Sequence, residues 1–262
     1  MLLVTRPLAA GQRLSAQLRA EGVDALWWPA FDLFLEPDPE ARNVLAGLAR
    51  FDLAILVSPM AARAVAALLP KGPGGRALWP RQTILAAVGD GTLEDAREAF
   101  EGLDESRVMA SVIVPGSGAS GSEGLLQELL SLPTPRRVLI ARAQKGRELL
   151  AEELRRRGAV VEQLAVYRRE AHVPSPERVA GLRAALGEPP AIVYTSTEAV
   201  GVVLAQLREY VPERVWPGEA FALCHHTRIA NAATAAGHKP GKIVPLDASA
   251  IAQVLRLRRA PV

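Results

Sequence analysis

The pattern of hydrophobic and polar positions that opens the chain occurs a second time near its middle. Residues 1–31 and residues 136–169 each begin with a short apolar run, continue with leucines at helical spacing, and then reach a glycine and a second apolar run. This pattern predicts a strand, an amphipathic helix and another extended segment in each copy. The predicted elements are 2–4, 10–21 and 23–34 in the first copy, and 138–141, 146–157 and a strand ending at Tyr167 in the second.

Four pairs of positions keep a constant spacing between the two copies. Each pair is 136 residues apart: Arg6 and Arg142, Leu14 and Leu150, Leu18 and Leu154, Gly22 and Gly158. Because charged, apolar and glycine positions recur together, the spacing indicates an internal duplication and predicts two domains of roughly 130 residues each.

Strand patterns alternate with helix patterns in the rest of the chain. The further predicted strands are 53–57, 84–88, 108–114, 191–194, 221–224 and 243–245. Loops rich in Pro and Gly interrupt this order at 36–39 and 71–81. Such alternation predicts an α/β protein with two doubly wound, flavodoxin-like domains built on parallel sheets. Ligands of these sheets bind at the carboxyl ends of the strands, so a cleft between the two domains is the expected site.

Composition sets wide limits on function. The 262 residues are 49% hydrophobic and 23% charged, with a formal net charge of +3, as in an ordinary water-soluble protein. No apolar run approaches the roughly 20 residues of a membrane span, no secretion signal opens the chain, and the single cysteine, Cys224, cannot form an internal disulfide. We therefore expect a cytoplasmic protein without a membrane partner. The arginine-weighted charge slightly favours carboxylate or phosphate ligands.

A glycine-rich loop suggests one candidate chemistry. Residues 116–121, GSGASG, lie between an apolar run and a helix, as in the G-x-G-x-x-G loop of dinucleotide-binding proteins. Against this interpretation, Pro115 precedes the loop, and the next strand ends in Arg142 where an acidic residue should hold a ribose hydroxyl. A flexible turn and a capping box of Ser120 and Glu123 explain the same residues. An NADP-dependent enzyme stays open as an alternative, and otherwise we expect no cofactor.

Two further patterns give weak signals. The first is a set of potential metal ligands: Cys224, His225 and His226, with His172 and His238 elsewhere in the chain. Their spacing fits no closed tetrahedral site, so we expect no metal. The second is the basic stretch at 256–259, which could contact nucleic acid but equally suits the last turn of a helix. We therefore expect no nucleic-acid partner.

Hydroxyl side chains recur where predicted strands lead into helices. They are Ser58, Thr92 and Ser122 in the first half of the chain, and Thr195, Ser196, Thr227 and Ser249 in the second. Each lies at a helix start, where Ser and Thr are common N-caps. Together they would line a rim of helix N-termini, which attracts anions and would suit a ligand with many carboxylates.

Several short motifs follow one another along the chain. They are VTRP at 4–7, Ser58-x-x-Ala, AVGDGT at 87–92, SEGLLQEL at 122–129, GRELLAEELRRRGA at 146–159, VYRR at 166–169 and TSTEAV at 195–200. Their order and spacing, over nearly the whole chain, resemble the uroporphyrinogen-III synthase family.

The resemblance implies a swapped duplication in place of two contiguous halves. The first strand and helix of each repeat would join the rest of the other repeat, with a two-stranded ladder between the domains. The implied domains are residues 1–34 with 170–262, and residues 38–166, with crossings near 35–37 and 167–169.

The resemblance also implies a reaction. The family cyclises hydroxymethylbilane, a linear tetrapyrrole with eight carboxylates, to uroporphyrinogen III, with inversion of ring D, loss of water and no cofactor. This lyase reaction belongs to porphyrin and haem biosynthesis. The tyrosine of the family's VY motif corresponds to Tyr167, which we expect to assist departure of the hydroxyl group as an acid. A partly buried structural tyrosine is the alternative interpretation of Tyr167.

The same resemblance suggests which residues bind the substrate. Residues at strand ends and helix starts would hold its acetate and propionate groups, namely Ser58, Thr92, Ser122, Glu123, Gly124, Thr195, Ser196 and Thr227. Basic residues would shape the charge nearby, namely Arg6, Arg142, Lys145 and Arg147.

The chain departs from the family's pattern at two places. His225 and His226 stand where members commonly have Gly-Pro, and Met60 stands where they have Asn. The offset of 136 aligns His225 with Gly89, and the departure leaves the role of Thr227 open. A two-domain small-molecule sensor is a second alternative to the enzyme, and we expect a monomer.

Overall fold

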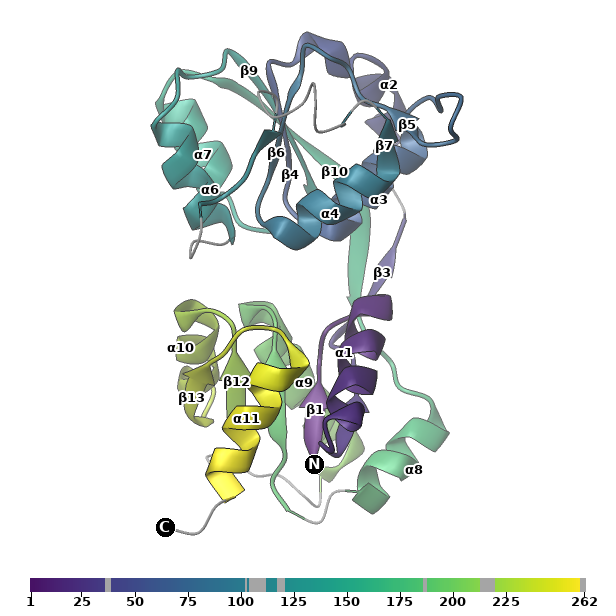
Figure 1. The fold of residues 1–262 in the computed structure, drawn as a ribbon, viewed down its shortest axis with the longest axis vertical. Helices are drawn as coiled ribbons and strands as arrows, with labels where there is room; N and C mark the ends of the chain where they lie inside the picture. Colours follow the sequence, from purple (N-terminus) through teal and green to yellow (C-terminus); the bar gives the residue numbers. More distant parts are fainter. Residues whose placement is uncertain are drawn as a thin grey trace. The chain divides into compact units, whose positions relative to one another are not determined.

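The computed structural model forms two compact units (Figure 1). Unit 1 consists of Met1–Asp32 and Glu170–Val262, and unit 2 of Leu33–Arg169. The residues that the structure describes are 1–35, 39–101, 103, 112–116, 121–185, 188–212 and 220–259.

Unit 1 contains a five-stranded sheet in the order β13-β12-β11-β1-β2, with parallel neighbours throughout. Its strands are β1 (Leu2–Val4), β2 (Ala25–Trp27), β11 (Ala191–Tyr194), β12 (Phe221–Cys224) and β13 (Lys239–Ile243). Its helices are α1 (Leu8–Ala20), α8 (Pro176–Ala185), α9 (Thr197–Tyr210), α10 (Thr227–Ala235) and α11 (Ala248–Arg259). Alternate strand residues such as Leu2, Val4 and Val193 form one core with α1 and α11. The chain-order sequence 2-1-3-4-5 across this sheet is that of the flavodoxin-like class.

Unit 2 contains a six-stranded sheet in the order β3-β10-β9-β4-β6-β8. Its strands are β3 (Phe31–Phe34), β4 (Leu53–Leu56), β6 (Ile84–Ala87), β8 (Val112–Ile113), β9 (Arg137–Ala143) and β10 (Val160–Ala171). Its helices are α2 (Ala41–Ala46), the 3-10 helix η1 (Leu48–Arg50), α3 (Pro59–Leu68), α4 (Asp90–Ala99), α6 (Gly121–Leu130) and α7 (Leu149–Arg156). A separate two-stranded sheet joins β5 (Ala77–Leu78) to β7 (Phe100–Glu101).

The sheet of unit 2 is covered on both faces. Leu56 and Leu139 belong to a core that includes residues of α3 and α4, whereas Ile55 and Ile140 belong to a second core with residues of α6 and α7. Because successive side chains of a strand point to opposite faces, helices on both sides produce these continuous apolar strands. This arrangement is the doubly wound architecture predicted from the strand and helix patterns.

The two copies of the repeat exchange partners between the sheets. In the first copy, β1 lies between β2 and β11 of unit 1, whereas in the second copy β9 lies between β10 and β4 of unit 2. The registers are equivalent, since Leu2 pairs with Ala191 and Val138 pairs with Leu53. The chain passes from one unit to the other within β3 and within β10, which are neighbours in the sheet.

Several element boundaries differ from the sequence predictions. The helix expected from residue 146 begins at Leu149, and β10 continues past Tyr167 to Ala171. The extended segment expected at 23–34 is two strands, and β5 lies inside the loop expected at 71–81. Of the loop at 36–39 and the strand at 108–114, residues 36–38 and 108–111 lie outside the described residues. In the described part of the chain, none of the helices has the length and apolar character needed to cross a membrane.

Candidate functional site

The carboxyl edge of the unit 2 sheet brings together nine of the predicted site residues. Ser58 follows β4, Thr92 lies in α4 after β6, and three residues begin α6 after β8, namely Ser122, Glu123 and Gly124. The other four come from β9, the loop after it and β10, namely Arg142, Lys145, Arg147 and Tyr167. Parallel strands end at a common edge, so residues far apart in the sequence gather there.

A pair of hydroxyl groups connects β4 with β10. Ser58 Oγ lies 3.1 Å from Tyr167 Oη, and it also accepts a hydrogen bond from the backbone N–H of Ala61 at 3.1 Å. Ser58 is the N-cap of α3, with extended backbone angles and a proline at the next position, which is the favoured local sequence for a helix start. The Ser58 hydroxyl is therefore held between a helix N-terminus and a tyrosine.

Tyr167 reaches Ser58 because β10 is irregular at this point. The pairing register of β10 with β9 shifts between Ala165 and Tyr167, and such a bulge redirects the side chains that follow it. Consequently Val166 and Tyr167 both belong to the same core of unit 2. The Tyr167 side chain is 6% exposed, and its backbone carbonyl accepts a hydrogen bond from Gln144.

Arg142 is largely buried and bonded within unit 2. Its guanidinium donates to Glu148 at 2.6 Å and to the side-chain oxygen of Gln163. The pKa of the Glu148 carboxyl group is lowered most by a hydrogen bond from Gln163 and next by the one from Arg142. Arg142 thus connects β9 with Glu148, the residue before α7. Its guanidinium is engaged in hydrogen bonds within unit 2.

Two further contacts involve Arg147 and the backbone of Lys145. Arg147 forms an ion pair with Glu123 at 2.7 Å, with both side chains about two-fifths exposed, so the pair stabilises the fold by about 1 kcal/mol at most. The carbonyl of Lys145 accepts a hydrogen bond from Arg169. These contacts connect the loop after β9 with the start of α6 and with β10.

Only some of the predicted hydroxyls are helix caps. Ser58 and Ser196 cap α3 and α9, with Ser196 Oγ accepting from Ala199 at 3.1 Å. Thr92 is instead buried in the third position of α4, which Gly89 precedes as N-cap. Ser122 lies in the second position of α6.

The predictions for Thr227 and Ser249 as caps are wrong. His226 caps α10 through Nδ1, which accepts from the backbone N–H of Arg228, and Thr227 is the exposed first residue of that helix. Asp247 accepts from the backbone N–H three residues later, and Ser249 donates to Glu21. His226 is consequently the counterpart of Gly89, one residue later than the spacing of 136 predicted.

The carboxyl edge of the unit 1 sheet carries the remaining predicted residues. Arg6 follows β1, Thr195 and Ser196 follow β11, and Thr227 begins α10 after β12. Since β1, β11 and β12 are consecutive in the sheet, these residues come from three adjacent strand ends. The boundary between β1 and β11 is also where the strand order reverses, the usual ligand position in such folds.

His225 joins this edge although it was not among the predicted binding residues. Burial lowers its pKa most, and the neighbouring charges of His226, Arg6 and Arg228 lower it further, while a hydrogen bond to the backbone of Tyr194 raises it. His225 therefore lies in a positive environment that favours its neutral form. The departure from the family's Gly-Pro was the sequence signal that marked this position.

The potential metal ligands are dispersed. His172 Nδ1 bonds Asp32 at 2.9 Å, and His238 Nε2 bonds the Tyr194 hydroxyl at 2.9 Å. Cys224 is buried, and burial raises its pKa to about 11. Within the described ranges, no three His, Cys, Asp or Glu residues are grouped so that they could hold a metal ion.

The glycine-rich loop offers one described contact. The N–H of Gly116 donates to the Glu128 carboxylate at 3.0 Å, so a negative group already occupies one donor that a dinucleotide pyrophosphate would need. Gly121 donates to the carbonyl of Val88, and residues 117–120, including Ser120 of the predicted capping box, lie outside the described residues.

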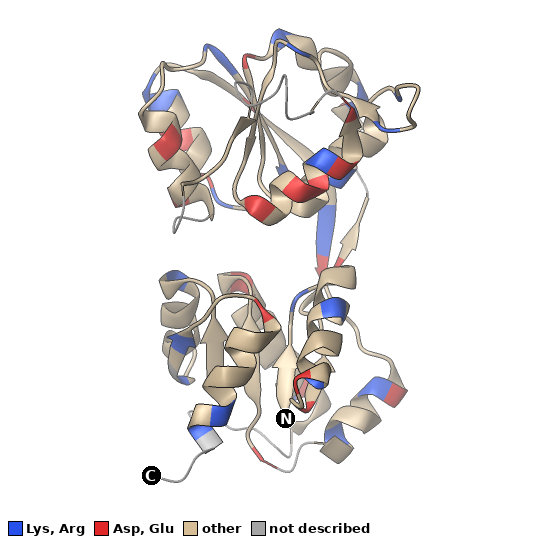
Figure 2. Cartoon of the chain, viewed as in Figure 1, with Lys and Arg blue, Asp and Glu red and all other residues tan. Residues whose placement is uncertain are grey.

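Basic and acidic residues are interspersed along the ribbons of both units (Figure 2). In the basic stretch at the end of α11, Arg256 pairs with Glu21 at 3.0 Å, and the Arg258 guanidinium lies 4.5 Å from the centre of the Phe221 ring. These two arginines are therefore engaged within unit 1, which gives no support to a nucleic-acid contact.

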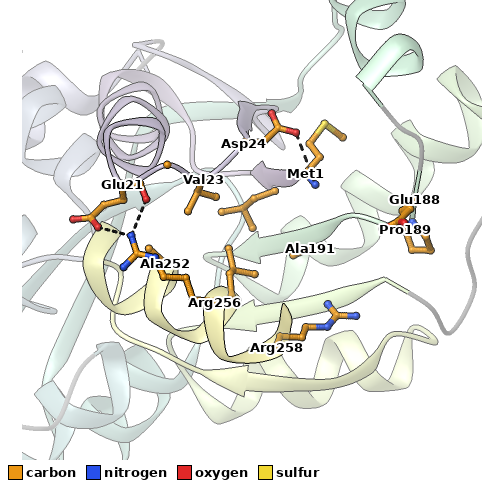
Figure 3. Close-up of a pocket in the computed structure, with 13 residues that line it drawn as sticks. Met1, Glu21, Val23, Asp24, Glu188, Pro189, Ala191, Ala252, Arg256 and Arg258 are labelled. Atoms are coloured by element: carbon orange, nitrogen blue, oxygen red, sulfur yellow. Dashed lines mark hydrogen bonds and ion pairs between the residues drawn. The ribbon is translucent and has the colours of Figure 1, made fainter. Parts of the chain in front are cut away.

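A pocket of about 230 Å³ lies at the opposite, amino edge of the unit 1 sheet (Figure 3). Its lining includes Leu2 and Ala191 at the starts of β1 and β11. It also includes Glu21 at the end of α1, and Ala252 and Arg256 on α11. The Glu21 and Arg256 side chains form an ion pair at 3.0 Å within this lining. Because ligands of parallel sheets bind at the carboxyl ends of the strands, this pocket is the weaker candidate.

Comparisons with known proteins agree with the family that the sequence motifs resemble. A family model described as uroporphyrinogen-III synthase HemD matches residues 12–245. This chain belongs to the uroporphyrinogen-III synthase family. A member from Escherichia coli (strain K12) is 31% identical over 232 residues, which are 87% of this chain and 85% of that protein. A member from Proteus mirabilis is 28% identical over 169 residues, or 64% of this chain and 79% of that one.

The fold of the uroporphyrinogen-III synthase family agrees with the predicted architecture. The crystal structure of a mutant uroporphyrinogen III synthase from the extremely thermophilic bacterium Thermus thermophilus aligns with a TM-score of 0.59 at 22% identity, covering 99% of this chain and 98% of the other. At this identity the likeness concerns the fold, and it supports the α/β class with two parallel-sheet units.

Proposed function

We propose that this protein is a lyase that cyclises hydroxymethylbilane to uroporphyrinogen III, with inversion of ring D and loss of water, in tetrapyrrole biosynthesis. The observation that carries the proposal is the family match over residues 12–245, together with a 31% identical uroporphyrinogen-III synthase aligned over 87% of the chain. The reaction requires no redox step, and the proposal assigns it no cofactor.

The chemistry requires an acid at the leaving hydroxyl group. Hydroxide departs poorly unless it receives a proton, and a positioned phenol can supply one. Tyr167 is the proposed acid, and its hydroxyl contact with Ser58 at the carboxyl edge of unit 2 supports this role. The cation left on the tetrapyrrole must then be held so that the substituted position of ring D attacks it, which is a matter of positioning.

The substrate's carboxylates require donors and positive charge. In unit 1, the proposed binding residues are Arg6, Thr195, Ser196 and Thr227, and the positive surroundings of His225 support an anionic ligand there. In unit 2, the proposed binding residues are Ser58, Thr92, Ser122, Glu123, Gly124, Arg142, Lys145 and Arg147. The N-termini of α3, α4 and α6 add backbone N–H groups at this edge.

The deciding experiment supplies freshly prepared hydroxymethylbilane and identifies the uroporphyrinogen isomer. We expect the type III isomer, formed faster than the spontaneous closure in a reaction with heat-denatured protein. Exclusive formation of type I, the product of unassisted closure, would refute the proposal. A thermal shift with NADPH and none with uroporphyrinogen III would instead favour the dinucleotide alternative.

A further inference from the structure

The Ser58 hydroxyl has two partners in unit 2. It accepts a hydrogen bond from the backbone N–H of Ala61 and lies 3.1 Å from the Tyr167 hydroxyl, where either oxygen could be the donor. A serine hydroxyl has one proton and two lone pairs, so it can accept from Ala61 and still donate to Tyr167. In that arrangement the Tyr167 proton points away from Ser58.

The internal duplication supplies a natural comparison. Ser196 is the N-cap of α9, and its bond to the backbone N–H of Ala199 has the same length, 3.1 Å, as the cap bond of Ser58. The position 136 residues before Tyr167 is Phe31, which has no hydroxyl. The two units therefore share the capping serine, and among the described contacts the serine of unit 2 is the one that meets a tyrosine hydroxyl.

We propose that Ser58 is a positioning residue that orients the Tyr167 hydroxyl and connects it to the N-terminus of α3. The proposal rests on the proposed function, because it assigns Ser58 a part in delivering the Tyr167 proton. When Ser58 donates a hydrogen bond to the Tyr167 oxygen, the proton of Tyr167 is directed away from Ser58. The same hydrogen bond stabilises the phenolate that forms when this proton leaves.

The proton balance of this step closes within the reaction. The Tyr167 proton goes to the oxygen of the leaving hydroxyl group, the carbon–oxygen bond breaks with its electron pair on oxygen, and water departs. The substituted carbon of ring D then bonds to the cationic carbon and gives a spiro intermediate. The bond from that ring carbon to its original methylene bridge breaks, and the unsubstituted α-carbon of ring D forms a new bond to this methylene. The α-carbon loses its proton as the pyrrole is restored, and this proton restores the phenol. While the phenolate exists, Ser58 donates a hydrogen bond to it, and the backbone N–H of Ala61 at the N-terminus of α3 donates a hydrogen bond to Ser58.

A double-mutant cycle tests the proposal through kcat and KM. We expect Ser58→Ala to lower kcat about tenfold, since it removes a hydrogen bond that strengthens as charge develops, and to raise KM only slightly through the loss of its part in substrate binding. In a Tyr167→Phe background the same change should alter kcat by less than about twofold, because the partner of Ser58 is already absent. Ser58→Thr retains a hydroxyl and should restore most of the lost kcat.

Matched variants separate this role from its alternatives. Ser196→Ala removes an equivalent cap and controls for the stability lost at a helix start, which urea unfolding measures for both variants. A raised KM with unchanged kcat in Ser58→Ala, or equal losses of kcat in the presence and absence of the Tyr167 hydroxyl, would overturn the positioning role. A wild-type protein that forms only the type I isomer would overturn the proposed function itself, so the two failures are distinguishable.

Discussion

Tyr167 is the residue on which the proposed chemistry depends most. Its ring packs in the core of unit 2 and its hydroxyl meets Ser58, so the phenol has a fixed position at the carboxyl edge of the sheet. Acid catalysis by a fixed side chain contributes typically about 10²–10⁴ in rate. A merely structural tyrosine would contribute packing and one hydrogen bond.

Replacing Tyr167 by Phe separates these two roles. If Tyr167 is the acid, kcat for uroporphyrinogen III formation should fall about 100-fold, while the free energy of unfolding falls by only about 1 kcal/mol for the lost hydrogen bond. Initial rates and urea titrations measure the two effects. Tyr210→Phe is the control, because Tyr210 lies at the end of α9, away from the strand ends. Undiminished turnover in Tyr167→Phe would remove Tyr167 from the acid role.

His225 should make stability depend on pH. Burial and the nearby positive groups His226, Arg6 and Arg228 lower its pKa below the ordinary value of 6.5, so around pH 6 the unfolded state binds more protons than the folded state. The free energy of unfolding therefore rises with pH through this window and falls as the pH drops below about 6.5.

Replacing His225 by Gln should reduce that pH dependence. Urea unfolding at pH 7 and pH 5.5 gives the difference for the wild type and the variant, and we expect a smaller difference in His225→Gln. His238 retains its own contribution in the variant, because burial lowers its pKa as well. Equal differences in both proteins would contradict the assignment to His225.

For single residues, the sequence predicted which positions start helices better than it predicted which side chains contact one another. Ser58 and Ser196 were recognisable as caps because Ser commonly starts helices, but the cap of α10 is the unexpected His226. The contact between Ser58 and Tyr167 joins positions 109 residues apart and depends on an irregularity of β10. Local composition contains no signal for such a register shift.

The two equivalent helices α1 and α7 end in the same way. Gly22 and Gly158 have φ of +78° and +93°, and their N–H groups bond the carbonyls of Arg19 and Arg155. Glycine adopts this left-handed conformation without steric cost and commonly ends helices. The repeated Gly in the sequence was therefore sufficient to predict both helix ends, whereas the start of α7, which lacks a side-chain cap, was predicted three residues too early.

Alanine substitutions in these elements should differ in severity. A Cβ at Gly22 or Gly158 would meet no atom within 4 Å, so each change to Ala should cost about 1–2 kcal/mol for the left-handed conformation alone. A Cβ at Gly11 of α1 would lie 1.8 Å from the Arg6 carbonyl oxygen, so Gly11→Ala should destabilise the protein more. Urea titrations of the three variants rank these costs, and a Gly11→Ala variant as stable as Gly22→Ala would contradict the close contact.

The duplicated chain folds into units that do not follow its repeats. The spacing of 136 residues revealed the duplication, but either repeat could in principle have supplied the first strand and helix of either sheet. Long-range contacts of individual residues favour the exchanged arrangement. Trp28, next to β2, is fully buried and donates to Gln206 of α9 at 3.1 Å. The same position in a contiguous first half would lack this partner and leave a buried N–H group unpaired.

Fragments of the chain should therefore fold according to the units and not according to the repeats. We expect residues 33–169 to unfold cooperatively in urea, because they contain both cores of unit 2. Trp79 is the only tryptophan of this fragment, and it packs edge-on against Phe100 in the core, so its fluorescence reports the transition. Residues 1–135 have a similar length but lack β9 and β10, and they leave Trp28 without Gln206. A cooperative transition in this second fragment, with none in the first, would show that the contiguous repeat is the folding unit.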